Sequence, residues 1–385
     1  MQDITLKVFK IVTFSFCVGK TKSLRSQKIT EKTLDFFGIV CYNILQTRKL
    51  VWETVYMAQQ KRILTGDRTT GKLHLGHYVG SLQNRVRLQN DYETFILMAD
   101  IQALTTHFEN PSLINGSIYD VAIDNLSVGL DPNKVTFVQQ SQIKAIAELT
   151  VFYSMLLSVN TLRHNPTIKT EAANYGYNDM TYGFLGYPVS QAADITFCNA
   201  ELVPVGEDQL PHIEIARKLV RRMNDLYGTQ LLEPKAMLSS CTRLMGLDGN
   251  SKMGKSLGNA IYLSDTAETV SEKIRLAVTD ASRIRAKDPG HPDICAVSKY
   301  HKVFNEEEYE DICERCKAGE IGCVACKKRL AEKLNGLLDP FRERRAYYEN
   351  HMNEVKEIVN SGSDRANKIG DENVAKIKEA MSLKI

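Results

Sequence analysis

The segment from residue 61 to about 227 alternates short apolar runs with stretches whose apolar residues recur at helical spacing. The apolar runs are residues 62–65, 94–99, 135–139 and 203–205. Helical spacing begins near His74, covers residues 114–129 and begins again at Leu210. Strands that alternate with helices in this way build a parallel sheet covered by helices on both faces. The sequence therefore predicts an α/β fold with a Rossmann-type parallel sheet.

Beyond about residue 265 the pattern changes, because no further strand is indicated. Apolar residues at helical spacing lie in this part at Leu330, Leu334, Leu337, Leu338 and Phe341. Such spacing is typical of amphipathic helices that pack on one another. We therefore expect a Rossmann-type domain at residues 57–264 and a helical domain at residues 265–385.

Residues 1–56 fit neither pattern. They contain nine lysines and arginines against four aspartates and glutamates, a net charge of +5. An organellar presequence would share this basic, acid-poor bias, whereas a secretory signal would need one apolar core and a small-residue cleavage site. The interpretation we favour is a poorly ordered extension that precedes a natural start at Met57.

The composition excludes several classes of protein. The formal net charge is only +3, so bulk charge does not indicate a nucleic-acid partner and any basic patch must be local. The longest apolar runs fall short of the roughly 18 residues that a membrane span requires. Nine cysteines are an odd number, which disfavours a disulfide framework. We expect a protein of a reducing compartment, the cytoplasm, with no membrane segment.

The first motif is the glycine-rich stretch Gly66-Asp-Arg-Thr-Thr-Gly71-Lys72-Leu73. It resembles a phosphate-binding P-loop, but Leu73 stands where a magnesium-binding Ser or Thr is required. This departure counts against a P-loop NTPase and leaves a phosphate-binding turn or a plain turn.

The second motif is His74-Leu-Gly76-His77, directly after the glycine-rich stretch. The two histidines could bind a metal, but no acidic or cysteine residue stands at matching spacing. Polar side chains and a glycine at the start of a helix also suit a nucleotide triphosphate. The remaining alternative is a pair of exposed histidines.

The third motif is Lys252-Met253-Gly254-Lys255-Ser256, set among further glycines. Two ammonium groups on a mobile loop can close over developing negative charge, such as a departing pyrophosphate. Alone, the pattern is weak, because charged runs are usually solvated.

The order of strand, HLGH, α/β sequence and KMGKS resembles the class I aminoacyl-tRNA synthetases. Within that class the chain resembles the tryptophanyl-tRNA synthetases in four stretches: Leu64–Gly71, Tyr187–Ile195, Val203–Gln209 and Ala277–Asp280. The resemblance covers residues 57–383. It implies that the amino-acid carboxylate attacks the α-phosphate of ATP, with Mg²⁺, and that pyrophosphate leaves. The family implies catalytic roles for His77, Lys169, Lys252 and Lys255. The implied ATP-binding residues are Arg68, Thr69, Thr70, Gly76, His77, Gly206, Glu207, Asp208, Leu244, Lys252, Met253, Gly254, Lys255 and Ser256.

The resemblance also implies the tryptophan site. Asp194 matches the aspartate that accepts the indole N–H, while Tyr187 and Gln209 match positions that hold the amino group. Gln191 stands where many of these enzymes carry a methionine against the indole. The stretch around Asp194 also resembles tyrosyl-tRNA synthetases, in which an aspartate receives a phenol O–H. The Gly206-Glu-Asp-Gln209 stretch favours tryptophan.

Five of the nine cysteines lie within residues 295–326. Cys316, Cys323 and Cys326 follow the spacing C-x6-C-x2-C, and Cys295 precedes them. Four thiolates can hold Zn²⁺ or a [4Fe–4S] cluster, and free thiols are the third alternative. Some tryptophanyl-tRNA synthetases carry a [4Fe–4S] cluster in the anticodon-binding domain with C-x22-C-x6-C-x2-C spacing; here the first gap is two residues shorter. This favours the cluster and leaves Cys313 as the spare thiol.

The resemblance implies tRNA(Trp), L-tryptophan and ATP as partners, and a homodimer. Phosphate contacts are expected from the basic residues near the cysteines and from residues 342–345. The alternatives are a tyrosyl-tRNA synthetase, a metal-binding RNA-recognition protein without catalysis, and a nucleotidyltransferase that shares the HxGH pattern.

Overall fold

The computed structural model describes residues 60–238, 244–249 and 253–383. The predicted extension at residues 1–56 and Lys252 lie outside these ranges. Residues 60–385 belong to one compact unit.

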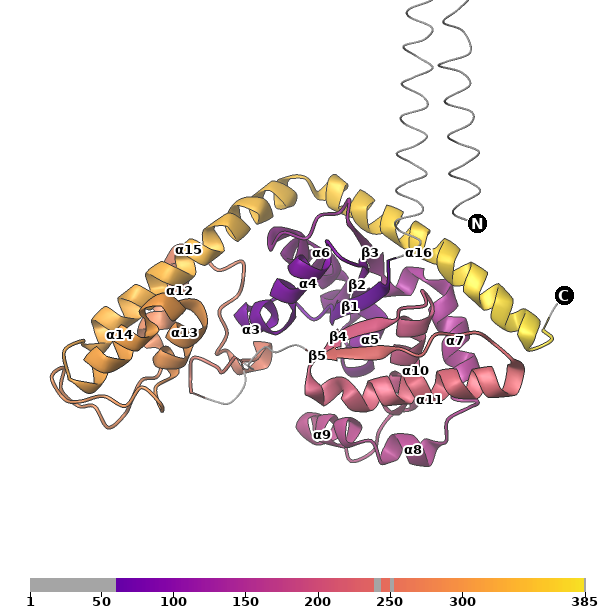
Figure 1. Cartoon of the computed structure of the whole chain (residues 1–385), viewed down its shortest axis with the longest axis horizontal. Helices are drawn as coiled ribbons and strands as arrows, with labels where there is room; N and C mark the ends of the chain where they lie inside the picture. Colours follow the sequence, from indigo (N-terminus) through magenta and orange to yellow (C-terminus); the bar gives the residue numbers. More distant parts are fainter. Residues whose placement is uncertain (1–59, 239–243, 250–252, 384–385) are drawn as a thin grey trace, which may run out of the picture. The chain divides into compact units, whose positions relative to one another are not determined.

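A five-stranded parallel sheet lies at the centre of this unit, in the order β3-β2-β1-β4-β5 (Figure 1). The strands are β1 (Arg62–Arg68), β2 (Glu93–Ala99), β3 (Val135–Gln139), β4 (Leu202–Val205) and β5 (Lys235–Leu238). The predicted Rossmann-type fold is confirmed, and the four predicted runs are strands. The edge strand β5 was not predicted, because its apolar run has only three residues and its side chains are partly or fully exposed.

Helices connect and cover the strands. They are α3 (Leu75–His77), the π-helical turn η1 (Tyr78–Leu82), α4 (Gln83–Leu88), α5 (Asp100–His107), α6 (Pro111–Ser127), α7 (Lys144–Ser154), α8 (Val159–Arg163), α9 (Pro166–Tyr175), α10 (Tyr182–Thr196), α11 (Leu210–Tyr227), α12 (Ala267–Leu276), α13 (Ala296–Phe304), α14 (Glu306–Lys317), α15 (Cys323–Asn350) and α16 (Met352–Ala380). Three short 3-10 turns complete the set: η2 (Gln140–Gln142), η3 (Glu207–Gln209) and η4 (Lys255–Leu257).

The sheet divides the apolar core into two clusters, because successive side chains of a strand point to opposite faces. Along β2, Phe95 and Leu97 join the cluster that α7, α10 and α11 cover. Ile96 and Met98 join the other cluster, which includes α6 and the apolar face of α15. Burial on both faces is what a central parallel strand requires.

After residue 265 the described chain is helical, as predicted, and its last two helices are long. Helix α15 has 28 residues and buries Leu330, Leu334 and Leu338 on one face. Helix α16 then returns to the sheet, where a Cβ at Gly362 would collide with the backbone of Phe137 in β3. A glycine is therefore required for this close approach. None of the described helices combines the length and the apolar character that crossing a membrane demands.

Candidate active site

A pocket opens where β1 and β4 lie side by side at their carboxyl ends. In a doubly wound sheet this is the switch point of the strand order, where ligands bind. The carboxyl-terminal part of β1 and the segment that runs from β4 into η3 form two of its walls, and α10 forms a third. Six residues predicted from the sequence line it together: Arg68, Tyr187, Gln191, Asp194, Gly206 and Gln209.

Asp194 lies on α10 and is almost completely buried, at 4% exposure. Its Oδ1 accepts a hydrogen bond of 2.7 Å from the side-chain amide of Gln140. The carbonyl oxygen of that amide accepts a bond of 2.9 Å from the backbone N–H of Gln102, which fixes its orientation. Burial raises the pKa of Asp194 to about 7, and the nearby Asp100 carboxylate adds to the shift. The carboxyl group is thus anchored and only weakly acidic.

Gln102 and Gln140 were missed in the sequence analysis. Gln102 lines the pocket, and its side-chain oxygen is buried without a hydrogen-bond partner among the described residues. Gln140 is the first residue after β3. A polar residue at the carboxyl end of a buried parallel strand was the signal that could have found Gln140.

The opposite end of the pocket is aromatic and charged. The Tyr187 hydroxyl lies 3.0 Å from Nε2 of His212, and the Arg68 guanidinium lies 5.7 Å from the Tyr187 ring centroid. Arg68 also forms an ion pair of 3.5 Å with Glu171, a lining residue that was not predicted. Burial lowers the pKa of His212 to about 4, so its ring is neutral near pH 7.

The glycine-rich stretch continues from β1 past the pocket. Asp67 is buried and is paired with Arg85, whose Nη1 lies 2.6 Å from its carboxylate. Burial raises the pKa of Asp67, but Arg85 and the other partners outweigh it and leave the pKa below the ordinary value. Thr70 closes a tight turn through a 2.9 Å bond from its N–H to the carbonyl of Arg68. The Thr69 hydroxyl is buried without a hydrogen-bond partner among the described residues.

The HLGH and KMGKS segments meet next to this stretch. His74 caps the short helix α3, and its Nδ1 accepts a bond of 3.1 Å from the N–H of Gly76. A Cβ at Gly76 would lie 3.6 Å from Cβ of Met253. Lys255 donates a bond of 2.6 Å to the carbonyl of Gly71. Segments about 180 residues apart in the sequence therefore form one surface.

Four other predicted ATP or phosphate residues lie away from the switch-point pocket's lining. Lys169 is exposed on α9, and Glu207 and Asp208 are exposed in η3. Leu244 is buried, and its carbonyl accepts a bond of 3.1 Å from the N–H of Met253. The structure thus brings Leu244 to the KMGKS segment, while the side chain of Ser256 lies outside the described part.

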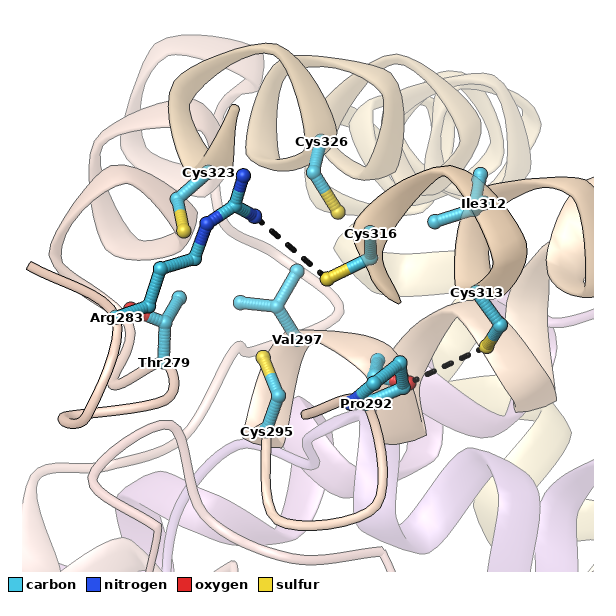
Figure 2. A pocket seen from close by; sticks show the side chains of 11 residues that line it. Thr279, Arg283, Pro292, Cys295, Val297, Ile312, Cys313, Cys316, Cys323 and Cys326 are labelled. Carbon is cyan, nitrogen blue, oxygen red and sulfur yellow. Dashed lines mark hydrogen bonds between the residues drawn. The ribbon is translucent and has the colours of Figure 1, made fainter. Parts of the chain in front are cut away.

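The cysteines form a second centre. Figure 2 shows Cys295, Cys316, Cys323 and Cys326 pointing toward one another across a shared cavity, from the start of α13, the end of α14 and the first turn of α15. Burial raises the pKa of Cys326 to about 12, and the neighbouring thiols add to the shift. Without a bound cation the Cys326 thiol is therefore protonated at neutral pH.

Cys313 differs from these four. It also lines the cavity, but it is buried and its sulfur is turned to the hydroxyl of Ser298, at 3.9 Å (Figure 2). Arg283 enters the cavity instead and donates from Nη1 to the sulfur of Cys316 at 3.7 Å. Its Nε is buried without a partner in the described part of the chain.

Two sequence expectations concern the metal cluster at the cysteines and the phosphate contacts of residues 342–345. Within the described ranges, no three or more histidine, cysteine, aspartate or glutamate side chains are already arranged to hold a metal ion, so the cluster stays a prediction. The expected phosphate-binding role of residues 342–345 is wrong for Arg345, because its guanidinium is buried at 4% exposure and paired with Asp120 and Asp124.

Comparisons with known proteins identify the family of the chain. The family model described as "tRNA synthetases class I (W and Y)" matches residues 57–339. A tryptophan–tRNA ligase of Streptococcus mutans is 48% identical over 332 residues, 83% of this chain and 98% of that protein. The corresponding Streptococcus pneumoniae ligase is 46% identical, with 83% and 97% covered.

A solved structure is also similar. The tryptophanyl-tRNA synthetase of Campylobacter jejuni, in complex with ADP and tryptophan, superposes with a TM-score of 0.76 at 30% identity. The match covers 83% of this chain and 99% of that one. The chain therefore belongs to the class I tRNA synthetases for tryptophan and tyrosine, and it groups there with the tryptophan–tRNA ligases.

Proposed function

We propose that the switch-point pocket is where this ligase activates L-tryptophan with ATP, before it transfers the amino acid to tRNA(Trp). The observation that carries the proposal is the buried Asp194, which is held by Gln140 at one end of a pocket that the glycine-rich stretch borders at the other. The Campylobacter jejuni relative, which was solved with tryptophan and ADP, supports the pairing of these two ligands.

In this proposal, Asp194 accepts the indole N–H. That group is the only polar handle of the tryptophan side chain. Because the carboxylate is buried, a phenylalanine side chain would leave it unpaired, and the penalty rejects this competitor. Gln140 orients Asp194, and Gln191 lies against the ring. Tyr187 and Gln209 bind the ammonium group of the substrate, which turns its carboxylate toward ATP.

The ATP residues of the glycine-rich stretch, HLGH and η3 hold the nucleotide so that its α-phosphate meets that carboxylate. The attack needs no protein nucleophile, and catalysis consists of positioning and electrostatic stabilisation. Lys252 and Lys255 neutralise the departing pyrophosphate together with Mg²⁺, and His77 and Lys169 add phosphate contacts. Lys255 already lies beside Gly71, and burial lowers its pKa, so a bound polyphosphate would stabilise its charged form.

An exchange assay tests the substrate. The chain is incubated with ATP, Mg²⁺, labelled pyrophosphate and one amino acid at a time. We expect label to enter ATP with tryptophan and not with tyrosine. Exchange driven by tyrosine alone would contradict the assignment, and tRNA binding without exchange for any amino acid would indicate an RNA-recognition protein.

We further propose that Cys295, Cys316, Cys323 and Cys326 hold a [4Fe–4S] cluster. Two features support the fit. The four thiols share one cavity, which Cys313 also lines, and their sulfurs are turned toward one another. The cavity also contains a buried arginine N–H without an acceptor among the described residues, and the sulfide or thiolate of a cluster would provide one. When bound, the cluster would cross-link the segments before α13, at the end of α14 and at the start of α15, with an arginine donor beside it.

Anaerobic purification tests the cluster. A brown protein with about four iron atoms per chain is the expected result. A colourless protein that contains zinc would replace the proposal with a zinc site. A protein without either metal would leave five free thiols and contradict both.

The remaining parts of the proposal concern partners. Residues 57–264 are assigned to catalysis and residues 265–385 to anticodon recognition. Exposed Lys317 and Lys328 beside the cysteines suit contacts with tRNA phosphates. A homodimer that works in the cytoplasm is proposed from the family. Size-exclusion chromatography with light scattering would test the dimer.

A further inference from the structure

Helix α6 fastens the glycine-rich stretch at both ends through two adjacent residues. At the start, Asn125 donates to Asp67 at 3.3 Å and accepts from Arg85 at 3.0 Å. At the end, Oδ2 of Asp124 accepts a bond of 2.7 Å from the backbone N–H of Leu73. Asp124 and Asn125 are themselves completely buried, at 0% exposure. The path of the stretch between Asp67 and Leu73 therefore depends on these two side chains.

Asp124 is in turn held by Arg345, which belongs to α15. Nη1 of Arg345 donates to Oδ1 of Asp124, and Nη2 donates to Asp120 at 2.8 Å. Its Nε donates to Glu349 at 2.8 Å. All three nitrogens of the guanidinium thus have carboxylate partners. Such charge-assisted bonds fix the geometry of both groups.

Leu73, whose N–H is bonded to Asp124, lies within two residues of both HLGH and the carbonyl group that accepts from Lys255. The carbonyl of Leu73 accepts a bond of 3.0 Å from the N–H of Leu263, so this residue is held from both sides. His74, the cap of α3, follows Leu73 directly. Gly71, two residues before Leu73, accepts the bond from Lys255. A shift of Leu73 would therefore move both HLGH and the acceptor of Lys255.

Helix α15 links this contact to a distant part of the molecule. The helix begins at Cys323 and carries Cys326 in its first turn, and Arg345 lies 22 residues after Cys323. At 1.5 Å per residue, this separation is about 33 Å. Buried side chains along α15 share one apolar cluster with Leu73 and Leu75. The helix and the glycine-rich stretch are therefore packed together as well as bonded.

A buried ion pair is weak evidence for a purely stabilising role. The cost of removing both charges from water is large, and apolar residues of similar volume often serve stability as well or better. What an apolar pair could not supply here is an oriented acceptor for the N–H of Leu73. Orientation of the glycine-rich stretch is thus the property that Arg345 and Asp124 uniquely provide.

We propose that Arg345, acting through Asp124, is a positioning residue that sets the glycine-rich stretch for ATP and couples ATP affinity to the placement of α15. This inference rests on the proposed role of that stretch in binding ATP. It assigns Arg345 no contact with substrate.

Kinetics of the full chain test the proposal. Arg345→Met, Arg345→Lys and the control Arg344→Met are compared in tryptophan-dependent pyrophosphate exchange. The control removes another bond between α15 and α6, from Nε of Arg344 to the carbonyl of Ser127 at 2.6 Å, without touching Asp124. We expect Arg345→Met to raise the KM for ATP on the order of tenfold, since small misplacements near a reacting group are costly. The KM for tryptophan should change less than twofold.

Rescue and control sharpen the test. Arg345→Lys should recover part of the ATP affinity. Arg344→Met should leave both KM values unchanged, because exchange is measured without tRNA, the ligand expected at residues 342–345. A purely structural role would lower the active fraction, and hence kcat, with both KM values intact, and this result would overturn the proposal. An equal rise in both KM values would overturn it too. Wild-type exchange with tryptophan tests the proposed function separately from these comparisons.

The double variant Asp124→Asn with Arg345→Met covers the case in which Arg345→Met folds poorly, because it leaves no unpaired buried charge. If the two residues act as one unit, the KM for ATP in the double variant should match that of the more severe single variant. Additive effects on that KM would contradict the relay from Arg345 through Asp124.

Discussion

The switch-point pocket and the cysteine centre are organised in different ways. In the pocket, two of the polar groups that we assign to tryptophan are held by other protein groups: Gln140 holds Asp194, and His212 holds Tyr187. In the cysteine centre, the thiols converge because their helices pack, and burial keeps Cys326 protonated. The first site is therefore organised before a ligand binds, whereas the second needs a cation to deprotonate and fix its thiols.

Asp194→Asn breaks the pocket most directly and has the largest expected effect. The amide keeps the shape but loses the charge and can present a donor to the indole N–H. We expect kcat/KM for tryptophan to fall on the order of a thousandfold, about 4 kcal/mol, since a site built around a buried polar group is severely weakened by a mismatch. Exchange kinetics measure this loss. A fall of less than tenfold would mean that Asp194 is not the indole acceptor.

Cys316→Ser tests the cysteine centre, with Cys313→Ser as the matched control. The two residues lie three positions apart on α14 and both line the cavity, but the sulfur of Cys316 is turned toward the other three cysteines, whereas that of Cys313 lies beside Ser298 (Figure 2). We expect Cys316→Ser to lose its iron and to melt at a temperature several degrees lower, because the segments joined there are no longer cross-linked. Cys313→Ser should keep both iron and melting temperature. Iron loss in Cys313→Ser alone would exchange the roles of the two cysteines.

Gln140→Leu removes the hydrogen bond that holds Asp194 and leaves the Asp194 carboxylate itself in place. Without the amide, the Asp194 carboxylate loses its anchor in a buried position. Loss of such a supporting residue typically costs ten- to a hundredfold, and we expect about tenfold in the KM for tryptophan. The KM for ATP should stay unchanged. Gln142→Leu, a change in the same η2 turn outside the pocket lining, is the control.

Residues that lie together on one helix could be predicted from the sequence, whereas residues that meet only through the folded sheet could not. Asp194, Tyr187 and Gln191 lie on one helix, α10, so a short motif was enough to place them together. Gln140 and Glu171 come from other elements, η2 and α9, and only the folded chain shows that they contact Asp194 and Arg68. The strands β1 to β4 were readable as apolar runs. The edge strand β5 has the same length as β4 but leaves Lys235 and Leu238 exposed, and its sequence carries no clear strand pattern.

Contacts between distant parts of the chain also explain why the burial of Arg345 could not be predicted from the sequence. In the sequence it belongs to a basic run and suggests a phosphate contact, since charged runs are usually solvated. Its partners Asp120 and Asp124 are more than 200 residues earlier, on α6. No local pattern shows that a helix of the C-terminal part buries this guanidinium against the catalytic part. The cysteine spacing, in contrast, gave four thiols that do converge.

The pH dependence of tryptophan binding is the smallest expected effect. It compares the pocket with Asp194 charged and the same pocket with Asp194 neutral. Burial raises the pKa of Asp194 to about 7, so its carboxyl loses its charge between pH 8 and pH 6. A neutral carboxyl is the weaker acceptor for the indole N–H, and we therefore expect the Kd for tryptophan to rise about fivefold over this interval. Titration calorimetry at constant ionic strength measures the change.

The rise in Kd at low pH would not come from unfolding caused by protonation of Asp194. A carboxyl group whose pKa is raised by folding stabilises the folded state below its ordinary pKa, near 3.8, and loses that contribution as pH rises through about 7. Acidification from pH 8 to pH 6 therefore favours folding through this group while it weakens tryptophan binding. His212 does not titrate in the interval, because burial lowers its pKa to about 4. A pH-independent Kd in wild type, or an equal pH dependence in Asp194→Asn, would show that another group controls binding.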